Sequence, residues 1–117
     1  LTYLEAARLG YYQEAGIYEP DASLLTGMVV VRNEIDYLAP IQLGQRVQVG
    51  LRVARLGGKS ITFIFQMNSD PDGTLLARGK SVMVTYDNTT EQGIPIPPAW
   101  REKIIHYEES KGNHDLT

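Results

Sequence analysis

The stretch Gly57-Gly58-Lys59-Ser60 has the residue types of a phosphate-binding loop. Such a loop needs a further glycine five residues before the second glycine, and it leads from a strand into a helix whose N–H groups hold the phosphate. In this chain Val53 occupies the position of the missing glycine, and the alternating run ITFIF after Ser60 is typical of a strand. We therefore interpret the glycine pair as a tight hairpin turn that requires positive φ angles.

Residues for nucleophilic, redox and metal chemistry are scarce. The 117 residues include no cysteine and only two histidines, His106 and His114, both close to the end of the chain. Thiolate catalysis, disulfide exchange and cysteine-ligated metal sites are therefore excluded. We predict an activity that needs neither a metal ion nor a cofactor.

The charge and the hydrophobic pattern also argue against nucleic acid and membranes as binding partners. The net charge is −3, and the basic residues are scattered along the chain, which does not fit a nucleic-acid-binding protein. No apolar run approaches the roughly 18 residues that a membrane helix needs. We expect a soluble, cytoplasmic protein of one domain spanning residues 1–117, with a frayed tail from about 108 to 117.

The elements that must position any site follow from the apolar periodicity. Apolar positions at three- and four-residue steps from Leu1 to Ala15 predict a helix that Gly16 ends. The segment from Tyr18 to Gly27 is expected to be a loop. Alternating runs then predict four strands in a meander, over residues 28–38, 46–56, 59–69 and 74–87. A short helix beginning at Pro98 follows.

One face of each predicted strand can be assigned from this alternation. The first strand is expected to place Val29, Val31, Asn33, Ile35 and Tyr37 on one side, and the third strand Ile61, Phe63, Phe65 and Met67. A polar Asn33 on the apolar side of the first strand must find a hydrogen-bond partner. A helix followed by a run of strands indicates an α+β fold with an antiparallel sheet, and the open edges of such a sheet favour pairing with another subunit.

Five segments, in order, resemble the hotdog-fold acyl-CoA thioesterases of the 4-hydroxybenzoyl-CoA thioesterase type. They are YLEAARLGYYQEAG, IDYLAPIQLGQRVQV, RVARLGGKSITFIFQM, LLARGKSVMVTYD and GIPIPPAWRE, and they cover nearly the whole chain up to about Glu102. The resemblance implies a long helix wrapped by a curved antiparallel sheet, with an N-terminal strand that this sequence lacks. It also implies a homodimer or homotetramer with active sites between the helix of one subunit and the sheet of another.

The resemblance implies hydrolysis of acyl-CoA to a free acid and coenzyme A. In the family, the catalytic acid lies in a segment resembling D-x-x-G-H-x-N-N-x-x-Y just before the helix, so we expect it upstream of Leu1. A backbone amide at the helix start would polarise the thioester carbonyl. Glu5 lies where another hotdog branch has its acid, but its surroundings do not match that branch, which favours a solvated or paired Glu5.

The resemblance also suggests where coenzyme A would bind. Six residues on or beside the strands are candidates for contacts with it: Arg55, Lys59, Ser60, Thr62, Arg78 and Lys80. Asp36 and Tyr37 belong to the stretch that resembles the family's strand beside the interface, and they are candidates for lining the interface or the site.

Two other functions remain open at this point. One is a hotdog dehydratase or hydratase, although such enzymes usually depend on a histidine in the strand–helix region and none occurs there. The other is a non-catalytic module that binds acyl thioesters, for which the upstream acid would be absent.

Overall fold

The computed structural model describes residues 2–17 and 26–116. Its elements are α1 (Thr2–Ala15), β1 (Thr26–Tyr37), β2 (Val47–Leu56), β3 (Ser60–Ser69), β4 (Leu75–Asp87), β5 (Gln92–Gly93) and α2 (Pro98–Ser110). The α+β class and the four main strands are therefore confirmed. Most of the loop expected over Tyr18–Gly27 lies outside the described residues, and its last two residues already belong to β1.

Helix α1 forms where the apolar spacing predicted it. Leu4, Arg8, Tyr11 and Ala15 are buried along one face, while Leu1 lies outside the described residues. Gly16 ends the helix with a φ of +83°, and its N–H donates to the carbonyl oxygen of Tyr12. A glycine is suited to this position because a residue with a Cβ is strained at positive φ.

The sheet is antiparallel in the order β1-β4-β3-β2, with β5 paired to β4. The predicted meander is right for β2, β3 and β4 but wrong for β1, which pairs with β4 at the far edge. Alternation shows which residues share a face but not which strands are neighbours. Gly79 permits the β1–β4 pairing, because a Cβ at that position would collide with the backbone carbonyl of Glu34.

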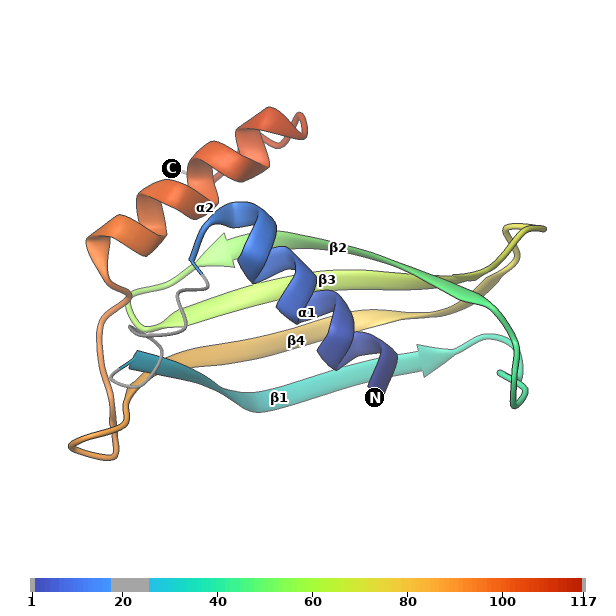
Figure 1. Cartoon of the computed structure of the whole chain (residues 1–117), viewed down its shortest axis with the longest axis horizontal. Helices are drawn as coiled ribbons and strands as arrows, with labels where there is room; N and C mark the ends of the chain where they lie inside the picture. The colour runs from blue at the N-terminus through green and yellow to red at the C-terminus, as the bar shows by residue number, and fades with distance from the viewer. Residues whose placement is uncertain (1, 18–25, 117) are drawn as a thin grey trace.

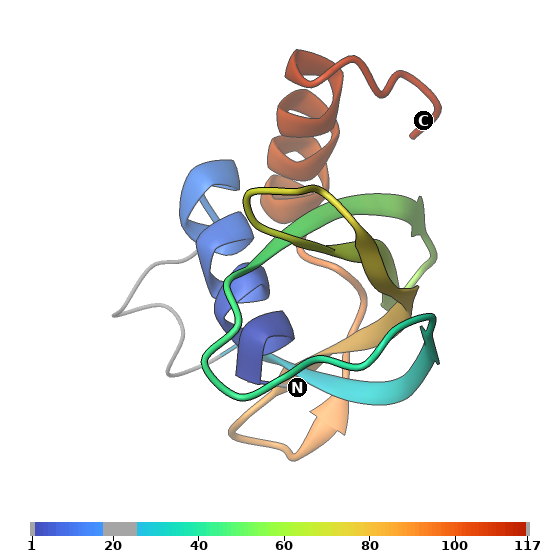
Figure 2. The same ribbon diagram turned by 90° about the vertical axis from the view of Figure 1, so that its right-hand side faces the viewer.

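Helix α1 lies against one face of the curved sheet (Figures 1 and 2). We call this the inner face, and the opposite one the outer face. The inner face carries a row of fully or nearly fully buried residues on the central strands: Ile61, Phe63, Phe65, Met67, Ala77, Ser81 and Met83. The common side predicted for β3 is thus confirmed.

A bulge between Val30 and Arg32 reverses which residues of β1 point to the inner face and which to the outer face. Val29 pairs with Val84 on the outer face, whereas Asn33 pairs with the buried Ser81 on the inner face. The prediction that Val29 and Asn33 share a side is therefore wrong, because one extra residue reverses the alternation that follows it.

The segment that follows residue 107 is packed rather than frayed, as far as the described residues extend. The carboxylate of Glu108, on α2, is 2% exposed and accepts hydrogen bonds from the hydroxyl of Tyr11 at 2.5 Å and the N–H of Val53 at 3.1 Å. Asn113 donates to the other oxygen of Glu108 and to the carbonyl of Val53. The expected fraying from residue 108 is wrong, since these polar contacts fasten the segment to α1 and β2.

The turn of Gly57 and Gly58 is confirmed as a hairpin between β2 and β3, but neither glycine has a positive φ. A Cβ at Gly57 would meet the hydroxyl of Ser60, which would have to rotate away. The carbonyls of Gly57, Gly58 and Lys59 accept hydrogen bonds from Arg101, Ile96 and Thr85. The N–H of Gly57 donates to the carbonyl of Ser60, so this backbone does not form a phosphate cradle.

Neither described helix is long and apolar enough to cross a membrane.

Candidate functional site

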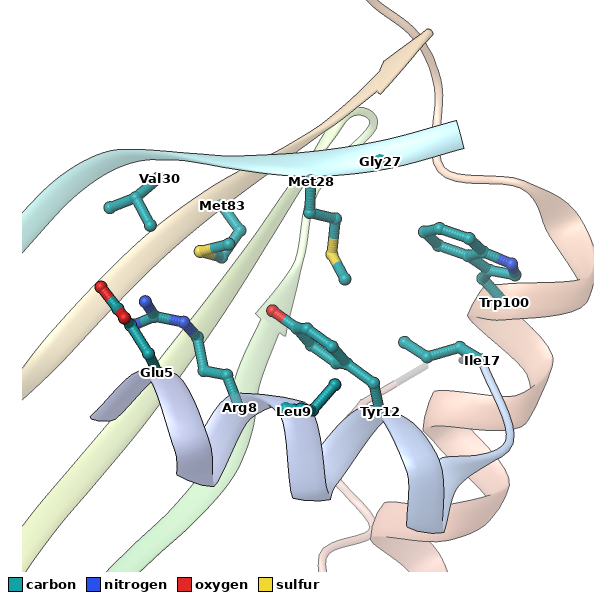
Figure 3. A pocket seen from close by; sticks show the side chains of 10 residues that line it. All are labelled: Glu5, Arg8, Leu9, Tyr12, Ile17, Gly27, Met28, Val30, Met83 and Trp100. Atoms are coloured by element: carbon teal, nitrogen blue, oxygen red, sulfur yellow. The ribbon is translucent and has the colours of Figure 1, made fainter. Parts of the chain in front are cut away.

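A pocket lies between α1 and the inner face of the sheet, near the β1 edge. Its cavity of about 360 Å³ falls within the range typical of small-molecule sites. Figure 3 shows side chains from α1, β1, β4 and α2 surrounding it. The lining residues are Glu5, Arg8, Leu9, Tyr12, Ile17, Gly27, Met28, Val30, Met83 and Trp100.

Most of this lining is apolar because α1, β1 and β4 each direct apolar side chains into the pocket. Leu9 and Tyr12 come from the side of α1 that faces the start of β1. Met28 and Val30 precede the bulge in β1, and Val30 pairs directly with Met83 of β4. An apolar surface of this kind can hold an acyl chain or a ring by burying its carbon atoms.

Arg8 is the buried charged residue of the lining, whereas the other charged lining residue, Glu5, is exposed. Arg8 is 7% exposed, and one of its terminal nitrogens, Nη1, donates to the hydroxyl of Ser81 at 3.5 Å. The Ser81 hydroxyl in turn donates to Oδ1 of Asn33 at 2.6 Å. The partner that a polar Asn33 required is therefore Ser81, and the contact joins α1 to β4 and β1.

Tyr12 brings a second polar group to the pocket. Its hydroxyl is buried and has no hydrogen-bond partner among the described residues. Burial raises the pKa of Tyr12 to about 12, although the nearby Arg8 cation opposes this effect. Tyr12 is therefore neutral near pH 7 and can both donate and accept a hydrogen bond.

The six residues predicted to contact coenzyme A lie elsewhere. None of them lines the pocket between α1 and the sheet. Arg55 pairs with Thr62, and Thr62 with Val82, on the outer face of the sheet. Lys59 and Ser60 lie at the β2–β3 hairpin, and Arg78 and Lys80 lie on the outer face of β4.

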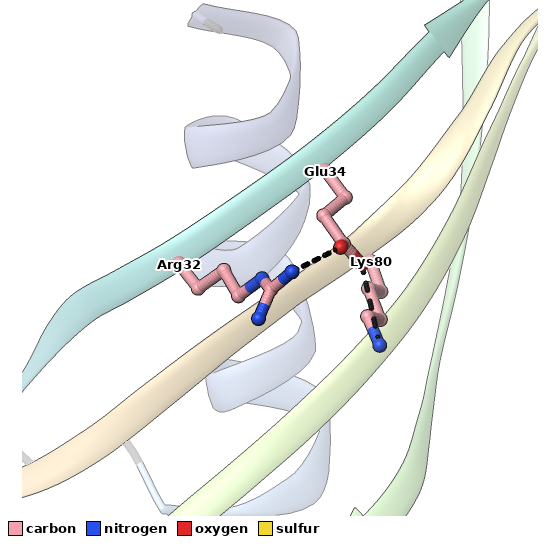
Figure 4. Close-up of polar contacts among 3 residues, drawn as sticks. All are labelled: Arg32, Glu34 and Lys80. Atoms are coloured by element: carbon pink, nitrogen blue, oxygen red, sulfur yellow. Dashed lines mark hydrogen bonds and ion pairs between the residues drawn. The ribbon is translucent and has the colours of Figure 1, made fainter.

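Lys80 takes part in a cluster of charges on the outer face (Figure 4). Glu34 accepts from Lys80 at 3.2 Å and from Arg32 at 2.6 Å. These hydrogen bonds, that of Lys80 above all, lower the pKa of Glu34. Lys80 is therefore already paired with a carboxylate, and Arg78 stands opposite Asp36 in the strand register.

Asp36 and Tyr37 lie at the end of β1, the edge strand next to the pocket. Asp36 is exposed on the outer face, and the side chain of Tyr37 is 65% exposed. Neither residue lines the pocket between α1 and the sheet.

Arg8, Tyr12, Met28, Met83 and Trp100 line the pocket but are not predicted as site residues from the sequence. One signal did mark Arg8: a charged side chain falls on the buried stripe of a helix, where charges are rare without a partner. The others have the side chains of an ordinary core, so that only the three-dimensional arrangement separates a pocket wall from packing.

Comparisons with known proteins identify the family. Residues 1–104 match the model of the thioesterase-like superfamily. A search of curated proteins found no match.

Several solved structures share the fold. A thioesterase from Thermus thermophilus, complexed with coenzyme A and Zn, is 34% identical with a TM-score of 0.76, covering 92% of this chain and 76% of that one. A structure described as a predicted thioesterase from Bacillus stearothermophilus is 29% identical with a TM-score of 0.75, covering 91% and 77%. A DHNA-CoA thioesterase from Staphylococcus aureus, 19% identical with a TM-score of 0.81 over 98% and 80%, supports the fold alone.

The architecture shared with these structures is the hotdog fold that the sequence predicts. The family model covers α1, the whole sheet and the beginning of α2. The chain therefore belongs to the thioesterase-like superfamily.

Proposed function

We propose that this protein hydrolyses acyl-CoA thioesters to a free acid and coenzyme A. The observation that carries the proposal is the apolar pocket beside α1, in a chain that belongs to the thioesterase-like superfamily. The pocket would hold the acyl group. The first turn of α1 has N–H groups without intrahelical acceptors, and they would stabilise the negative charge that develops on the thioester oxygen.

Hydrolysis also needs a carboxylate that acts as a general base on water or as a nucleophile. The prediction that this acid precedes Leu1 remains a prediction. Glu5 is the only carboxylate of the described residues that lines the pocket, and it is exposed. Replacing Glu5 with Gln separates the two possibilities: retained kcat supports an acid elsewhere, whereas a loss of about a hundredfold or more assigns the base to Glu5.

The coenzyme would run along the strands toward the surface. Lys59 is exposed at the hairpin, which makes it our preferred contact for a coenzyme A phosphate, with Arg55, Ser60 and Thr62 lining the approach. Arg78 and Lys80 remain candidates, but Lys80 would have to exchange its bond with Glu34 for one with phosphate.

We propose that the protein acts as a homodimer or homotetramer. Strand β1 is an edge of the sheet, and Val29, Val30 and Val31 on it are each at least 41% exposed. An exposed apolar edge strand is a template for pairing with a second copy. Asp36 and Tyr37, further along β1 than the residues that line the pocket, would then lie at the interface. A cytoplasmic location remains a prediction.

The proposal is tested by measuring thiol release from a panel of acyl-CoAs that vary in chain length and aromaticity. We expect release of free coenzyme A from at least one member at a rate well above the uncatalysed reaction. Tight binding of coenzyme A without any thiol release would favour the non-catalytic binding module instead. Water addition to an enoyl-CoA, without thiol release, would favour a hydratase.

A further inference from the structure

The polar end of the pocket points to a class of acyl group. We propose that Arg8 and Tyr12, which we call the Arg8–Tyr12 pair, bind a carboxylate carried by the acyl chain. The preferred substrates would then be coenzyme A thioesters of dicarboxylic acids, with one carboxyl group as the thioester and the other free. This inference rests on the proposed function, because it places the acyl group in the same pocket.

The first argument is the burial of the Arg8 charge. A guanidinium carries five N–H donors, and it remains protonated in proteins. Arg8 is 7% exposed, yet among the described side chains its defined hydrogen bond is the long one to Ser81 at 3.5 Å, and the neighbouring Tyr12 hydroxyl is close enough for Arg8 to lower its pKa. No carboxylate of the described residues forms an ion pair with it. Buried charges are normally paired, so an anion is the expected complement.

The second argument is the orientation of Tyr12. Its hydroxyl is buried without a hydrogen-bond partner among the residues that the structure describes. Figure 3 shows it directed from α1 toward Arg8. The two residues are four apart, so they lie on the same side of the helix. A carboxylate between them would accept from the guanidinium and from the hydroxyl, and such hydrogen bonds to a charged group are among the stronger ones in proteins.

The third argument is the contrast between this pair and the surrounding walls. Leu9, Met28, Val30 and Met83 offer only apolar surface, which suits the methylene groups of an acyl chain. Glu5 also lines the pocket, three residues before Arg8, and Figure 3 shows its exposed side chain at the same end of the pocket as the guanidinium. A bound carboxylate would therefore lie on the side of Arg8 that faces Tyr12, away from Glu5. The charge of the ligand is therefore expected at Arg8 and its carbon chain along the apolar walls.

The length of the chain follows from the geometry of the helix. Arg8 lies six residues after Thr2, the first residue of α1, which corresponds to about 9 Å along the helix axis at 1.5 Å per residue. If the thioester carbonyl is bound at the helix start, the free carboxylate belongs to a short acyl chain.

Binding can be tested without hydrolysis by using thioether analogues, which have no carbonyl to attack. Titration calorimetry would compare S-(4-carboxybutyl)-coenzyme A with S-pentyl-coenzyme A, which has a neutral chain of matched length. We expect the carboxylated analogue to bind the full-length protein at least about tenfold more tightly, the size of effect that hydrogen bonds to a buried charge produce.

Two variants assign this preference to the pair. Tyr12→Phe removes one hydroxyl and should reduce the preference severalfold, while Arg8→Lys keeps the charge but loses the planar fork and should reduce it further. Tyr3→Phe is the matched control, since Tyr3 is exposed on the same helix and does not line the pocket. Melting curves of all variants show whether each remains folded.

Hydrolysis of glutaryl-CoA and pentanoyl-CoA provides the second readout. A higher kcat/KM for glutaryl-CoA that Tyr12→Phe lowers selectively supports the inference. Equal binding of the two thioethers, or tighter binding of the neutral one, overturns it even if both thioesters are hydrolysed, because Arg8 would then be satisfied by water or by a second subunit. If no thioester is hydrolysed but the carboxylated analogue binds preferentially, the proposed function fails while the anion site stands.

Discussion

At Tyr12, burial and a neighbouring cation act on the same hydroxyl in opposite directions. Burial favours the neutral phenol, and the Arg8 guanidinium favours the phenolate. Burial is the larger effect, so the pKa rises to about 12. The consequence for function is a neutral hydroxyl beside a buried cation, two groups that can bind one acceptor together.

This shift predicts how stability depends on pH. The pKa of Tyr12 in the folded protein lies above the ordinary value of 10.0. The stability that Tyr12 contributes is therefore fully present below about pH 10 and is lost as the pH rises to about 12. We expect the free energy of unfolding of Tyr12→Phe, measured with urea, to fall less steeply across this window than that of the wild type. Burial raises the pKa of Tyr11 as well, so part of the slope remains.

Tyr3→Phe is the control for this pH series, because Tyr3 is exposed on the same helix. Identical slopes for the wild type and Tyr12→Phe would contradict the assignment of Tyr12 as a buried, neutral phenol.

Lys59 tests the proposed path of the coenzyme. Its side chain is exposed at the β2–β3 hairpin, while its carbonyl oxygen bonds to Thr85. Lys59→Ala should weaken coenzyme A binding severalfold in low salt and less at high salt, since the contact would be between exposed charges. Calorimetry at two salt concentrations measures this. Lys111→Ala, which removes an exposed lysine after α2, is the control, and unchanged binding in Lys59→Ala would remove Lys59 from the site.

At the scale of elements, two bulges decide where side chains point. The bulge in β1 brings Asn33 to Ser81. The bulge in β2 falls between Val53 and Arg55, and the N–H of Val53 donates to Glu108. Strand β2 is an edge of the sheet. Both backbone groups of Val53 on this edge are hydrogen-bonded, because its N–H donates to Glu108 and its carbonyl accepts from Asn113. This contact connects α2 to the strand against which α1 also packs.

Glu108 is predicted to hold these elements together. Glu108→Leu would leave the hydroxyl of Tyr11 and the N–H of Val53 buried without an acceptor. We expect the free energy of unfolding to fall by about 2–4 kcal/mol, the cost of losing hydrogen bonds to a charged group and burying unsatisfied donors. Urea denaturation measures this loss. Glu102→Gln, at an exposed position of α2, should change stability by less than about 0.5 kcal/mol, and a similarly small effect in Glu108→Leu would refute the role of Glu108.

The sequence predicts the elements well because periodicity reports burial directly. The stripe of α1, the buried side of β3 and the start of α2 at Pro98 all follow from spacing. The position of β1 next to β4 does not, because alternation carries no information on strand order. The sequence also does not predict the bulge of β1, since the β-branched residues at 29, 30 and 31 suit either face of the sheet.

The candidate site is predicted less well than the fold. Its chemical class follows from resemblance, but the pocket is built from residues such as Met28, Met83 and Trp100 that are far apart in the chain and typical of a core. The conspicuous Gly-Lys-Ser stretch instead forms a hairpin whose backbone bonds to Arg101, Ile96 and Thr85. Residue type alone therefore draws attention to the hairpin and not to the pocket.

At the scale of the whole molecule, the β1 edge would connect the site to the proposed dimer interface. The strand exposes apolar side chains next to the pocket, and Val31 at its bulge is 58% exposed. Pairing with a second copy along β1 would cover these residues and complete the wall of the site.

Val31→Lys tests this assembly. A charge at an apolar edge opposes strand pairing, so we expect the molecular mass in solution, measured by light scattering, to fall to that of the monomer. Thioesterase activity should fall with it if the partner completes the site. Leu43→Lys, at a fully exposed residue between β1 and β2, is the control. A wild-type protein that is monomeric and active would contradict the proposal.

The central claim is that the pocket between α1 and the sheet holds the acyl group of a thioester during hydrolysis. Leu9 lines this pocket and is 44% exposed, so Leu9→Trp can fill the pocket without overpacking the core. The most direct measurement is kcat/KM for thiol release across a series of acyl-CoAs of increasing chain length. The account predicts that Leu9→Trp shifts the optimum to shorter chains while the melting temperature is maintained. An unchanged profile in a folded Leu9→Trp protein would contradict it.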